Sequence, residues 1–381
     1  MITAEDLIAK AQIYVNSISN RVEPSDWFEF FTESIRELRR GRTLPEQRRP
    51  LTMDFFTNVF QYKLQDDFDS FIKPHLSMFE ASDEGPYLVY GRDKDFFASN
   101  KYGLALTNET TGKYLLARIN GQSDICIDNF NDADTTSYTL TGDGSNLLIN
   151  NYNYKENNQS LQFDITDVTH ASILKKTFPS ATDLTDMVKF GGTAFLYVYM
   201  PTAITSIKMR LLSSTGNYYQ TLPVTTNFYG QSFQVGWNLI AMPLQTKTTV
   251  GTPDVTMIAN YELEINNTGV SGSGFLFDAL YLRIPTKMEL PYNSKNLVLD
   301  ADGVTYKETV AAETDTILCD DTFEAVIMYN STWHAATWKY NDKDLADNAI
   351  AKLRQSMIEF NRRYPSTEAP VQSNYYRHNK F

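Results

Sequence analysis

Apolar residues recur at the spacing of one helix face near both ends of the chain. Leu7, Ile8 and Ala11 follow Thr3, which can cap a helix, and a second apolar stripe begins after Pro24. The clearest stripe has spacings of 3, 4, 3 and 4 and consists of Ile350, Leu353, Met357, Phe360 and Tyr364. The pattern therefore predicts helices in the first 75 residues and a long helix that begins after Asp342 or Asp344 and ends at Pro365.

Residues 120–285 have a different pattern. Short runs rich in β-branched and aromatic residues alternate with Gly, Asn, Thr and Ser, which is typical of an all-β sandwich. The runs are LQFDIT, AFLYVYM, ITSIKMRLL, NLIAMPL, YELEIN and GFLFDALYLRI, and only DLTDMVKF reads as a helical turn. We therefore predict a helix-rich domain made of residues 1–119 plus 286–364, with a β-sandwich inserted at 120–285 and an extended tail at 365–381.

The charge balance argues against general affinity for nucleic acid. The 381 residues contain 34 Lys and Arg against 46 Asp and Glu, a formal charge of −12. Cys126 and Cys319 lie far apart and suggest neither a disulfide nor a metal framework. The N-terminus lacks a charged-then-apolar leader, and no apolar run approaches membrane-spanning length, so we expect synthesis in the cytoplasm without membrane insertion.

The residues of common catalytic motifs are missing from the sequence. The four histidines are scattered, and neither an HExxH pair, a Gly-x-Ser-x-Gly elbow, a phosphate-binding Gly-Lys-Ser/Thr loop nor a GxGxxG motif is present. A glycosidase carboxylate pair cannot be chosen from so many acids. We therefore expect no enzymatic activity and assign no catalytic residue.

The stretch CIDNFNDADTTSYTLTGDG, residues 126–144, is rich in Asp and Asn and is a candidate calcium loop. With Asp132 at position 1 of an EF-hand, Asp134 fits position 3 and Asp143 falls at position 12. Position 6 is then Ser137 instead of Gly, and the bidentate Glu is missing. An EF-hand is excluded, whereas a calcium site assembled from distant segments of the sandwich stays open.

Two further groups of side chains suggest binding. A basic run can be a solvated helix end, or it can contact DNA or an acidic protein; it consists of Arg36, Arg39, Arg40, Arg42, Arg48 and Arg49. Four tyrosines of the sandwich can stack on sugar rings or pack across strands, namely Tyr152, Tyr154, Tyr218 and Tyr219. Trp237 is expected in the core.

The motifs of residues 125–285 resemble the jelly rolls of carbohydrate-binding modules. The matching stretches are IDNFND, NQSLQFDIT, DLTDMVKFGGTAFLYVYMP, VGWNLIAMPL and FLFDALYLR. The resemblance implies a structural calcium ion between the first and last strands, held by Asp128 and Asp278, with Asn129 as a less secure ligand. Asn131 stands where the family often has a Glu, which departs from the pattern.

The flanking segments resemble the head-to-tail connector, or adaptor, proteins of tailed bacteriophages. The stretches are DWFEFFTESIRELRR, FFTNVFQYKLQDDFDSFI and TDTILCDDTFEAVIMYNSTWHAA before the last helix. The resemblance implies a helical bundle, a ring that is a dodecamer, and a C-terminal extension that docks on the portal. The docking residues would be Tyr375, Tyr376, Arg377 and Phe381. The insert roughly doubles the size of an ordinary adaptor.

Together these resemblances predict an α+β multidomain chain in which a discontinuous helical adaptor-like domain carries an all-β jelly-roll sandwich. The expected function is that of a structural virion protein at the portal, with itself, portal and tail proteins as partners and genome DNA as a further contact. The alternative is a tail or fibre component that binds host glycans through the jelly roll. A secreted-type glycoside hydrolase is a weaker third hypothesis. No membrane partner is expected, and structural calcium is the sole cofactor implied.

Overall fold

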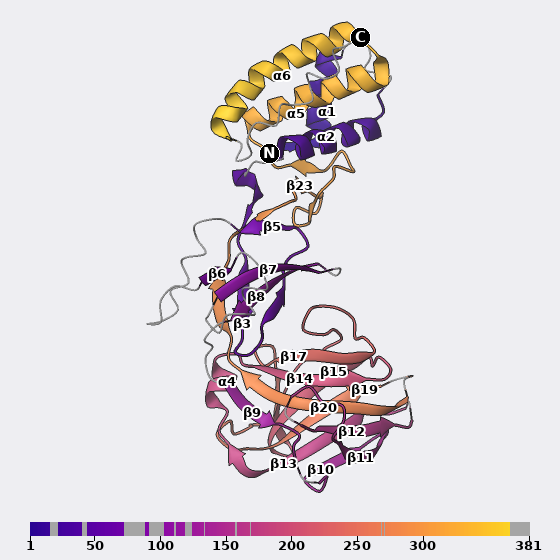
Figure 1. Ribbon diagram of the computed structural model, residues 1–381, viewed down its shortest axis with the longest axis vertical. Coiled ribbons are helices and arrows are strands. Elements are labelled where there is room, and N and C mark those ends of the chain that lie inside the picture. The colour runs from indigo at the N-terminus through magenta and orange to yellow at the C-terminus, as the bar shows by residue number, and fades with distance from the viewer. Residues whose placement is uncertain are drawn as a thin grey trace. The chain divides into compact units, whose positions relative to one another are not determined.

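The chain divides into two compact units, which are described here one at a time (Figure 1). The computed structural model describes residues 1–15, 22–39, 44–71, 88–90, 103–109, 112–118, 124–132, 134–156, 158–167, 169–267, 269 and 271–365. The helical unit comprises Met1–Thr52, Gln65–Met78 and Glu289–Phe381. The sandwich unit comprises Met53–Leu64 and Phe79–Met288.

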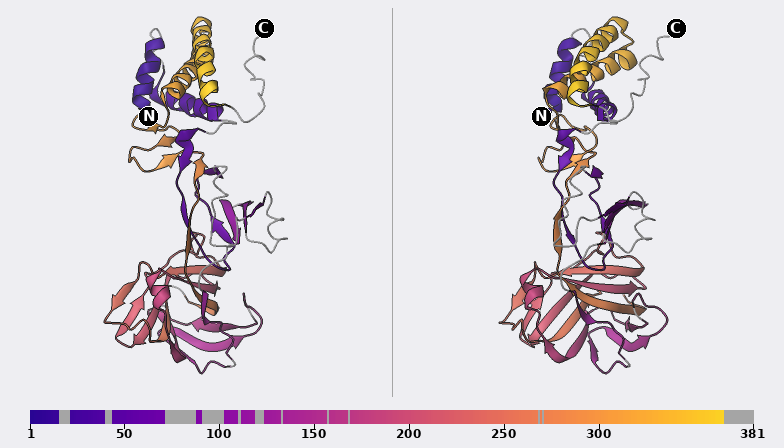
Figure 2. Two further views of the ribbon diagram at one scale, coloured as in Figure 1. Left: turned by 90° about the vertical axis from the view of Figure 1, so that its left-hand side faces the viewer. Right: turned by 60° about the vertical axis from the view of Figure 1, so that its left-hand side comes forward.

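The helical unit buries one core between helices from both ends of the chain. Helix α5 (Asp321–His334) contacts α1 (Ala4–Tyr14), α2 (Pro24–Arg39) and α6 (Lys343–Arg363). The four helices also lie together in both views of Figure 2. A π-helical segment, Ala335–Tyr340, extends α5. The predicted helices at both ends are thus confirmed, whereas their packing does not by itself show an adaptor.

Polar caps set the helix starts where the sequence suggested them. The Thr3 side chain accepts a hydrogen bond from the Asp6 N–H, and Asp342 accepts one from the Leu345 N–H at the start of α6. Asp320 caps α5 in the same way, through the N–H of Phe323. Among the described helices, none is long and apolar enough to span a membrane.

Short strands complete the helical unit. One sheet runs in the order β1-β25-β23-β24, and a second in the order β2-β22-β5. The first comprises Ile2–Thr3, Thr316–Ile317, Val298–Leu299 and Tyr306–Lys307, and the second Arg48–Arg49, Tyr292–Ser294 and Phe68–Phe71. A short 3-10 helix, Pro45–Gln47, precedes β2.

The sandwich unit is built from two six-stranded sheets that enclose one apolar core. The first sheet, in order, consists of β10 (Tyr138–Thr141), β13 (Ser172–Thr182), β19 (Ile258–Asn266), β15 (Ser206–Ser214), β16 (Asn217–Gln220) and β18 (Thr248–Val250). The second consists of β11 (Gly144–Asn150), β12 (Ser160–Ile165), β20 (Gly272–Arg283), β14 (Thr193–Met200) and β17 (Gly236–Pro243), with β9 (Asp124–Asp128) paired to β20. The predicted all-β sandwich is confirmed.

Alternation of side chains explains why these sequences form the two sheets. In β15, Ile207, Met209 and Leu211 are buried in the core, while Lys208 and Arg210 between them keep part of their surface exposed. The single predicted helical turn is also present, as α4 (Thr185–Lys189).

The sandwich unit is larger than the predicted insert, which began at residue 120. It also contains a four-stranded sheet, β4-β8-β7-β6, of Gln61–Lys63, Gly112–Arg118, Gly103–Glu109 and Leu88–Tyr90. The ring of Phe56 lies 4.7 Å from that of Phe195 on β14. Strands β3 (Thr52–Phe55) and β21 (Thr286–Glu289) form a separate two-stranded sheet. These pairings join segments that are distant in sequence, which periodicity cannot reveal.

Candidate functional site

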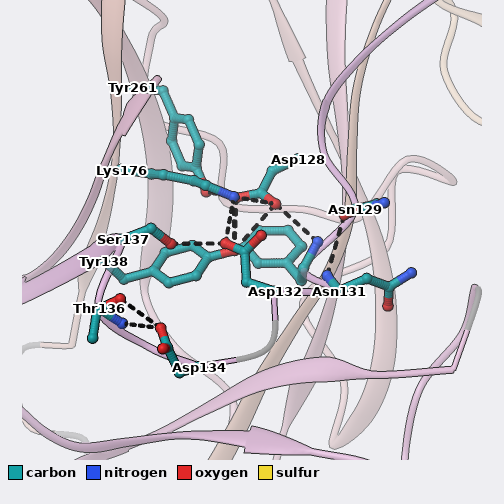
Figure 3. A network of polar contacts seen from close by, with 11 residues as sticks. Asp128, Asn129, Asn131, Asp132, Asp134, Thr136, Ser137, Tyr138, Lys176 and Tyr261 are labelled. Atoms are coloured by element: carbon teal, nitrogen blue, oxygen red, sulfur yellow. Dashed lines mark hydrogen bonds and ion pairs between the residues drawn. The ribbon is translucent and has the colours of Figure 1, made fainter. Parts of the chain in front are cut away.

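The stretch that begins at Cys126 places Asp128 in a buried polar network between the two sheets (Figure 3). Asp128 ends β9 and its side chain is fully buried. Its Oδ1 accepts hydrogen bonds from the Phe130 N–H at 2.8 Å and from Lys176 Nζ at 3.0 Å. The hydroxyl of Tyr138 lies 3.1 Å from both carboxylate oxygens, and that of Tyr261 donates to Oδ2. Four donors thus satisfy one buried carboxylate.

The acids that follow Asp128 have different roles. Asp132 Oδ2 lies 2.8 Å from Lys176 Nζ and accepts from Ser137 Oγ at 2.7 Å. Burial alone would raise the pKa of Asp132, but the hydrogen bonds from Lys176 and Ser137 outweigh it and lower the pKa. Asp134 accepts bonds from the N–H and hydroxyl of Thr136 and forms a turn. Lys176 is therefore held by two carboxylates.

Asp128 and Asp278, the two acids predicted to hold calcium, have different hydrogen-bond partners. Asp278 Oδ2 accepts from the N–H groups of Lys155 and Glu156, which are not partners of Asp128. Asn129 is exposed and its Oδ1 accepts from the Asn131 N–H at 3.2 Å. Within the described ranges, no three His, Cys, Asp or Glu side chains cluster as metal ligands would. The cation that faces Asp128 is the Lys176 ammonium, and no local sequence pattern links residues 128 and 176.

Asp278 instead fastens a loop to the second sheet. Its Oδ2 lies 2.6 Å from the Lys155 nitrogen and 2.8 Å from the Glu156 nitrogen. Burial raises the pKa of Asp278 to about 6, and the negative charge of Glu156 acts in the same direction. The two backbone donors oppose this rise without cancelling it. Asp278 is thus a carboxyl group that gains its proton in the sandwich at a higher pH than in the unfolded chain.

We expect the pH dependence of stability to contain a contribution from Asp278. Because its pKa in the folded protein is raised, its stabilising contribution is complete below the unfolded value, about 4, and is lost as the pH rises through about 6. In Asp278→Asn, the Asn oxygen can still accept both backbone bonds but does not titrate. Melting temperatures of wild type and variant between pH 4 and pH 8, values chosen to bracket the pKa of about 6, measure the difference. A difference that stays constant with pH would contradict the assignment.

The outward face of the first sheet carries an array of paired charges. In register across β13, β19, β15 and β16 stand Lys175, Glu262, Arg210 and Gln220. Arg210 Nη1 lies 3.1 Å from Glu262, its Nη2 bonds Glu264, and its Nε donates to Gln220 Oε1 at 2.7 Å. In the adjacent row, Lys208 Nζ lies 2.8 Å from Glu264. The Arg210 side chain is 19% exposed, so the array is ordered yet accessible to solvent.

The four tyrosines proposed for sugar stacking occupy different places. Tyr152 is 95% exposed and Tyr154 is exposed too, both in the loop after β11. Tyr218 on β16 faces outward, with the Arg210 guanidinium carbon 5.5 Å from its ring centre. Tyr219 faces the opposite way and packs against the core. The structure therefore joins only Tyr218 to the charged array.

The expectation that Trp237 lies in the core is wrong. Trp237 is partly exposed on the outward side of β17, where its ring packs edge-on against Tyr199 at 5.6 Å. Its Nε1 donates to Asn153 Oδ1 at 3.0 Å. The residue pairs with Tyr199 in the register of β14 and β17, whereas core positions of β17 such as Ile240 alternate with it. The side of a strand follows from register, which the apolar run GWNLI does not reveal.

The arginine run is used mainly within the helical unit, as far as the structure describes it. Arg36 lies 3.9 Å from Glu33 and 3.7 Å from Glu308, and Arg39 donates to the Lys295 carbonyl. Arg49 donates to backbone carbonyls and covers the ring of Tyr306 at 4.1 Å. Arg48 is exposed. Arg40 and Arg42 lie outside the described residues, as do the predicted docking residues Tyr375, Tyr376, Arg377 and Phe381.

A polar cavity of about 420 Å³ also lies in the helical unit. Its lining includes Asp67, Tyr292 and Lys295. Asp67 accepts hydrogen bonds from the Tyr292 hydroxyl at 2.8 Å and from Ser294 Oγ at 2.6 Å. These bonds tie β22 to the turn before β5, so this carboxylate has a structural role.

Comparisons with known proteins give similarity to solved structures alone. No protein-family model matches the chain, and no curated protein matches it. A family 11 carbohydrate-binding module from Clostridium thermocellum, in complex with a β-1,3-1,4-mixed-linked tetrasaccharide, is 12% identical, with 42% of this chain and 94% of that chain covered and a TM-score of 0.31. A family 30 carbohydrate-binding module of a Clostridium thermocellum cellulase is 10% identical, with 42% and 96% covered and a TM-score of 0.32. The enzymatically active domain of bacteriophage CBA120 tailspike protein 4 is 16% identical, with 41% and 20% covered and a TM-score of 0.25.

Proposed function

We propose that the sandwich unit binds a glycan, without cleaving it, on the outward face of the first sheet. The observation that carries the proposal is the array centred on Arg210, which lies between Glu262, Glu264 and Gln220 and beside the ring of Tyr218. Such a face offers fixed hydrogen-bond donors and acceptors next to an aromatic surface.

The chemistry of this face suits a sugar. Each sugar hydroxyl both donates and accepts hydrogen bonds, so it needs carboxylate or amide oxygens as well as cationic N–H donors. Glu262, Gln220 and Arg210 supply both kinds within one cross-strand row. The apolar face of a sugar ring can rest on the ring of Tyr218, which combines an apolar body with a polar tip.

The ion pairs also keep the array rigid before a ligand arrives. Arg210 is fixed by three neighbours, so less side-chain freedom is lost on binding than for an unpaired arginine. Cross-strand ion pairs also stabilise sheets that bind nothing. The experiment therefore has to separate recognition from sheet stability.

The test is binding of the full-length chain to a glycan array, followed by titration of the sugars that are retained. Tyr218→Ala is expected to weaken binding about tenfold or more, equivalent to about 1.4 kcal/mol, because the stacking surface is lost. Arg210→Lys keeps the charge but not the planar fork, and should weaken binding as well. The bound sugar should be recovered intact.

Tyr152→Ala is the matched control, because Tyr152 is a highly exposed tyrosine of the same unit that lies away from the array. It should leave binding unchanged. Loss of binding in Tyr152→Ala with full binding in Tyr218→Ala would move the site to the other sheet. A chain that retains no sugar at all would overturn the proposal.

For the helical unit we propose a place in the virion of a tailed phage, either in a tail or fibre or in a ring at the portal. This is supported by the resemblance of the flanking segments to connector proteins and by α6, whose Ile358 is 74% exposed although Leu353 and Phe360 of the same helix are buried. Light scattering with and without purified portal tests the ring. A stable monomer without affinity for portal would exclude the junction and leave the tail or fibre.

A further inference from the structure

The contact between Lys176 and Asp128 brings an amine and a carboxyl group together inside the sandwich. Lys176 Nζ lies 3.0 Å from Asp128 Oδ1, and the side chains are 12% and 0% exposed. From this geometry we propose that the two side chains join in an intramolecular amide, formed between Lys176 Nζ and Asp128 Cγ with release of one water molecule. The bond would link the end of β9 to β13, two strands of different sheets.

Proximity and burial favour this reaction. Two groups held in contact react as one molecule, with effective concentrations on the order of 10⁵ M or more in well-oriented cases. Two aromatic rings lie beside the contact: the ring of Tyr138 lies 4.6 Å from Lys176 Nζ, and Phe130 stacks on Tyr138 at 6.1 Å. A site with little water lowers the tendency of the amide to hydrolyse.

Hydrogen-bond donors already surround the oxygens that would carry negative charge during attack. The hydroxyls of Tyr261 and Tyr138 both reach Asp128 Oδ2, and the Phe130 N–H reaches Oδ1. Burial raises the pKa of both tyrosines, so their hydroxyls stay protonated and remain donors. Donors in this position stabilise a tetrahedral intermediate in acyl transfer.

Asp132 provides a path for protons and for the departing water. Its Oδ2 lies 2.8 Å from Lys176 Nζ, and its side chain is 34% exposed. The site therefore borders solvent at one end. The exposed position also allows Asp132 to exchange protons with water while it stays in contact with the nitrogen.

The step balances without a further reactant. A proton passes from the Lys176 ammonium to the Asp128 carboxylate, which gives a neutral amine and a neutral acid. The nitrogen lone pair forms a bond to Asp128 Cγ. The electron pair of the C=O bond moves onto Oδ2, where the two tyrosine hydroxyls stabilise the negative charge. One nitrogen proton then moves, through Asp132, to the leaving hydroxyl; the C–O bond breaks, and water leaves. Nothing is oxidised or reduced.

The mass of the intact full-length chain tests the proposal. We expect a mass one water molecule below that of the sequence, and after protease digestion a branched peptide that joins residues 128 and 176. Lys176→Arg should have the unmodified mass, because the guanidinium is not nucleophilic under these conditions. Lys175→Arg is the matched control: Lys175 is the neighbouring residue, lies 3.8 Å from Glu262 on the outward face, and should leave the water loss unchanged.

Asp128→Asn gives a second, independent readout. If the amide forms, the asparagine releases ammonia instead of water, and the product has the same mass as cross-linked wild type. Asp132→Asn should slow the loss of water in freshly made protein. A wild-type chain with the full mass of its sequence and no branched peptide would overturn the proposal. A water loss that persists in Lys176→Arg would also overturn it, and would point to another contact such as Lys307 with Asp315 at 2.6 Å.

Discussion

Replacing Asp128 by alanine is expected to lower the free energy of unfolding of the sandwich unit by about 3–5 kcal/mol. The fully buried carboxylate accepts hydrogen bonds from the Phe130 N–H, from two tyrosine hydroxyls and from the Lys176 ammonium. Without it, these donors lose their acceptor in the interior. The Lys176 ammonium then keeps the partly exposed Asp132 as its remaining carboxylate partner. The loss is expected whether Asp128 and Lys176 are joined by an ion pair or by an amide.

Hydrogen exchange measured peptide by peptide suits this prediction, since a chain with two compact units need not unfold in one step. Protection should fall in β9, β13 and β19, which supply Asp128, Lys176 and Tyr261. Asp134→Ala is the control in the same loop, because Asp134 is exposed and its hydrogen bonds within the described part of the chain go to Thr136. Equal protection in Asp128→Ala and Asp134→Ala would show that the network does not hold the sheets together.

The second large effect is expected in the helical unit, where Phe360→Ala should cost about 3–5 kcal/mol. Phe360 on α6 is fully buried, 5.5 Å from the ring of Phe323 on α5 and 5.1 Å from that of Tyr364. Tyr364 in turn donates to Asp320, the residue that caps α5. Removing the ring leaves a cavity between α5 and α6 and loosens this end of the pair.

Ile358→Ala is the matched control on the same helix, because Ile358 is 74% exposed and contributes little to the core. The two variants are compared by hydrogen exchange of peptides from α5 and α6. If both variants lose protection equally, α6 is not held by Phe360. If the helical unit forms a ring, Ile358→Ala should instead weaken assembly, which separates the two faces of α6.

The two predictions concern two different hydrophobic cores, one in each unit. The sandwich core and the helical core share no residue. A variant that unfolds one unit can therefore leave the other folded, and glycan binding should survive Phe360→Ala but not Asp128→Ala. This comparison would connect the proposed binding face to the sandwich unit directly.

Much of the secondary structure could be predicted from sequence because helix faces and caps are local. The spacing of Leu353 and Phe360 predicts α6, and Asp342 starts it as its side chain caps the first turn. The recurring β-rich runs likewise predict a sandwich. Each of these signals lies within about twenty residues of sequence, so no tertiary information is needed.

The site depended on contacts that only the tertiary structure decides. Lys176 is brought to Asp128 by the packing of one sheet on the other, since β13 and β9 belong to different sheets. Register likewise turns Tyr218 outward beside Arg210 and Tyr219 inward, although the two are neighbours in sequence.

The stretch from Cys126 to Gly144 contains both a feature that its sequence determines and one that only the tertiary structure determines. Its sequence alone shows that it is no EF-hand loop. That Asp128 is a buried acceptor facing a lysine, two tyrosines and a backbone N–H was decided only by the folded sheets, because a charge can be buried only where its partners converge from elsewhere.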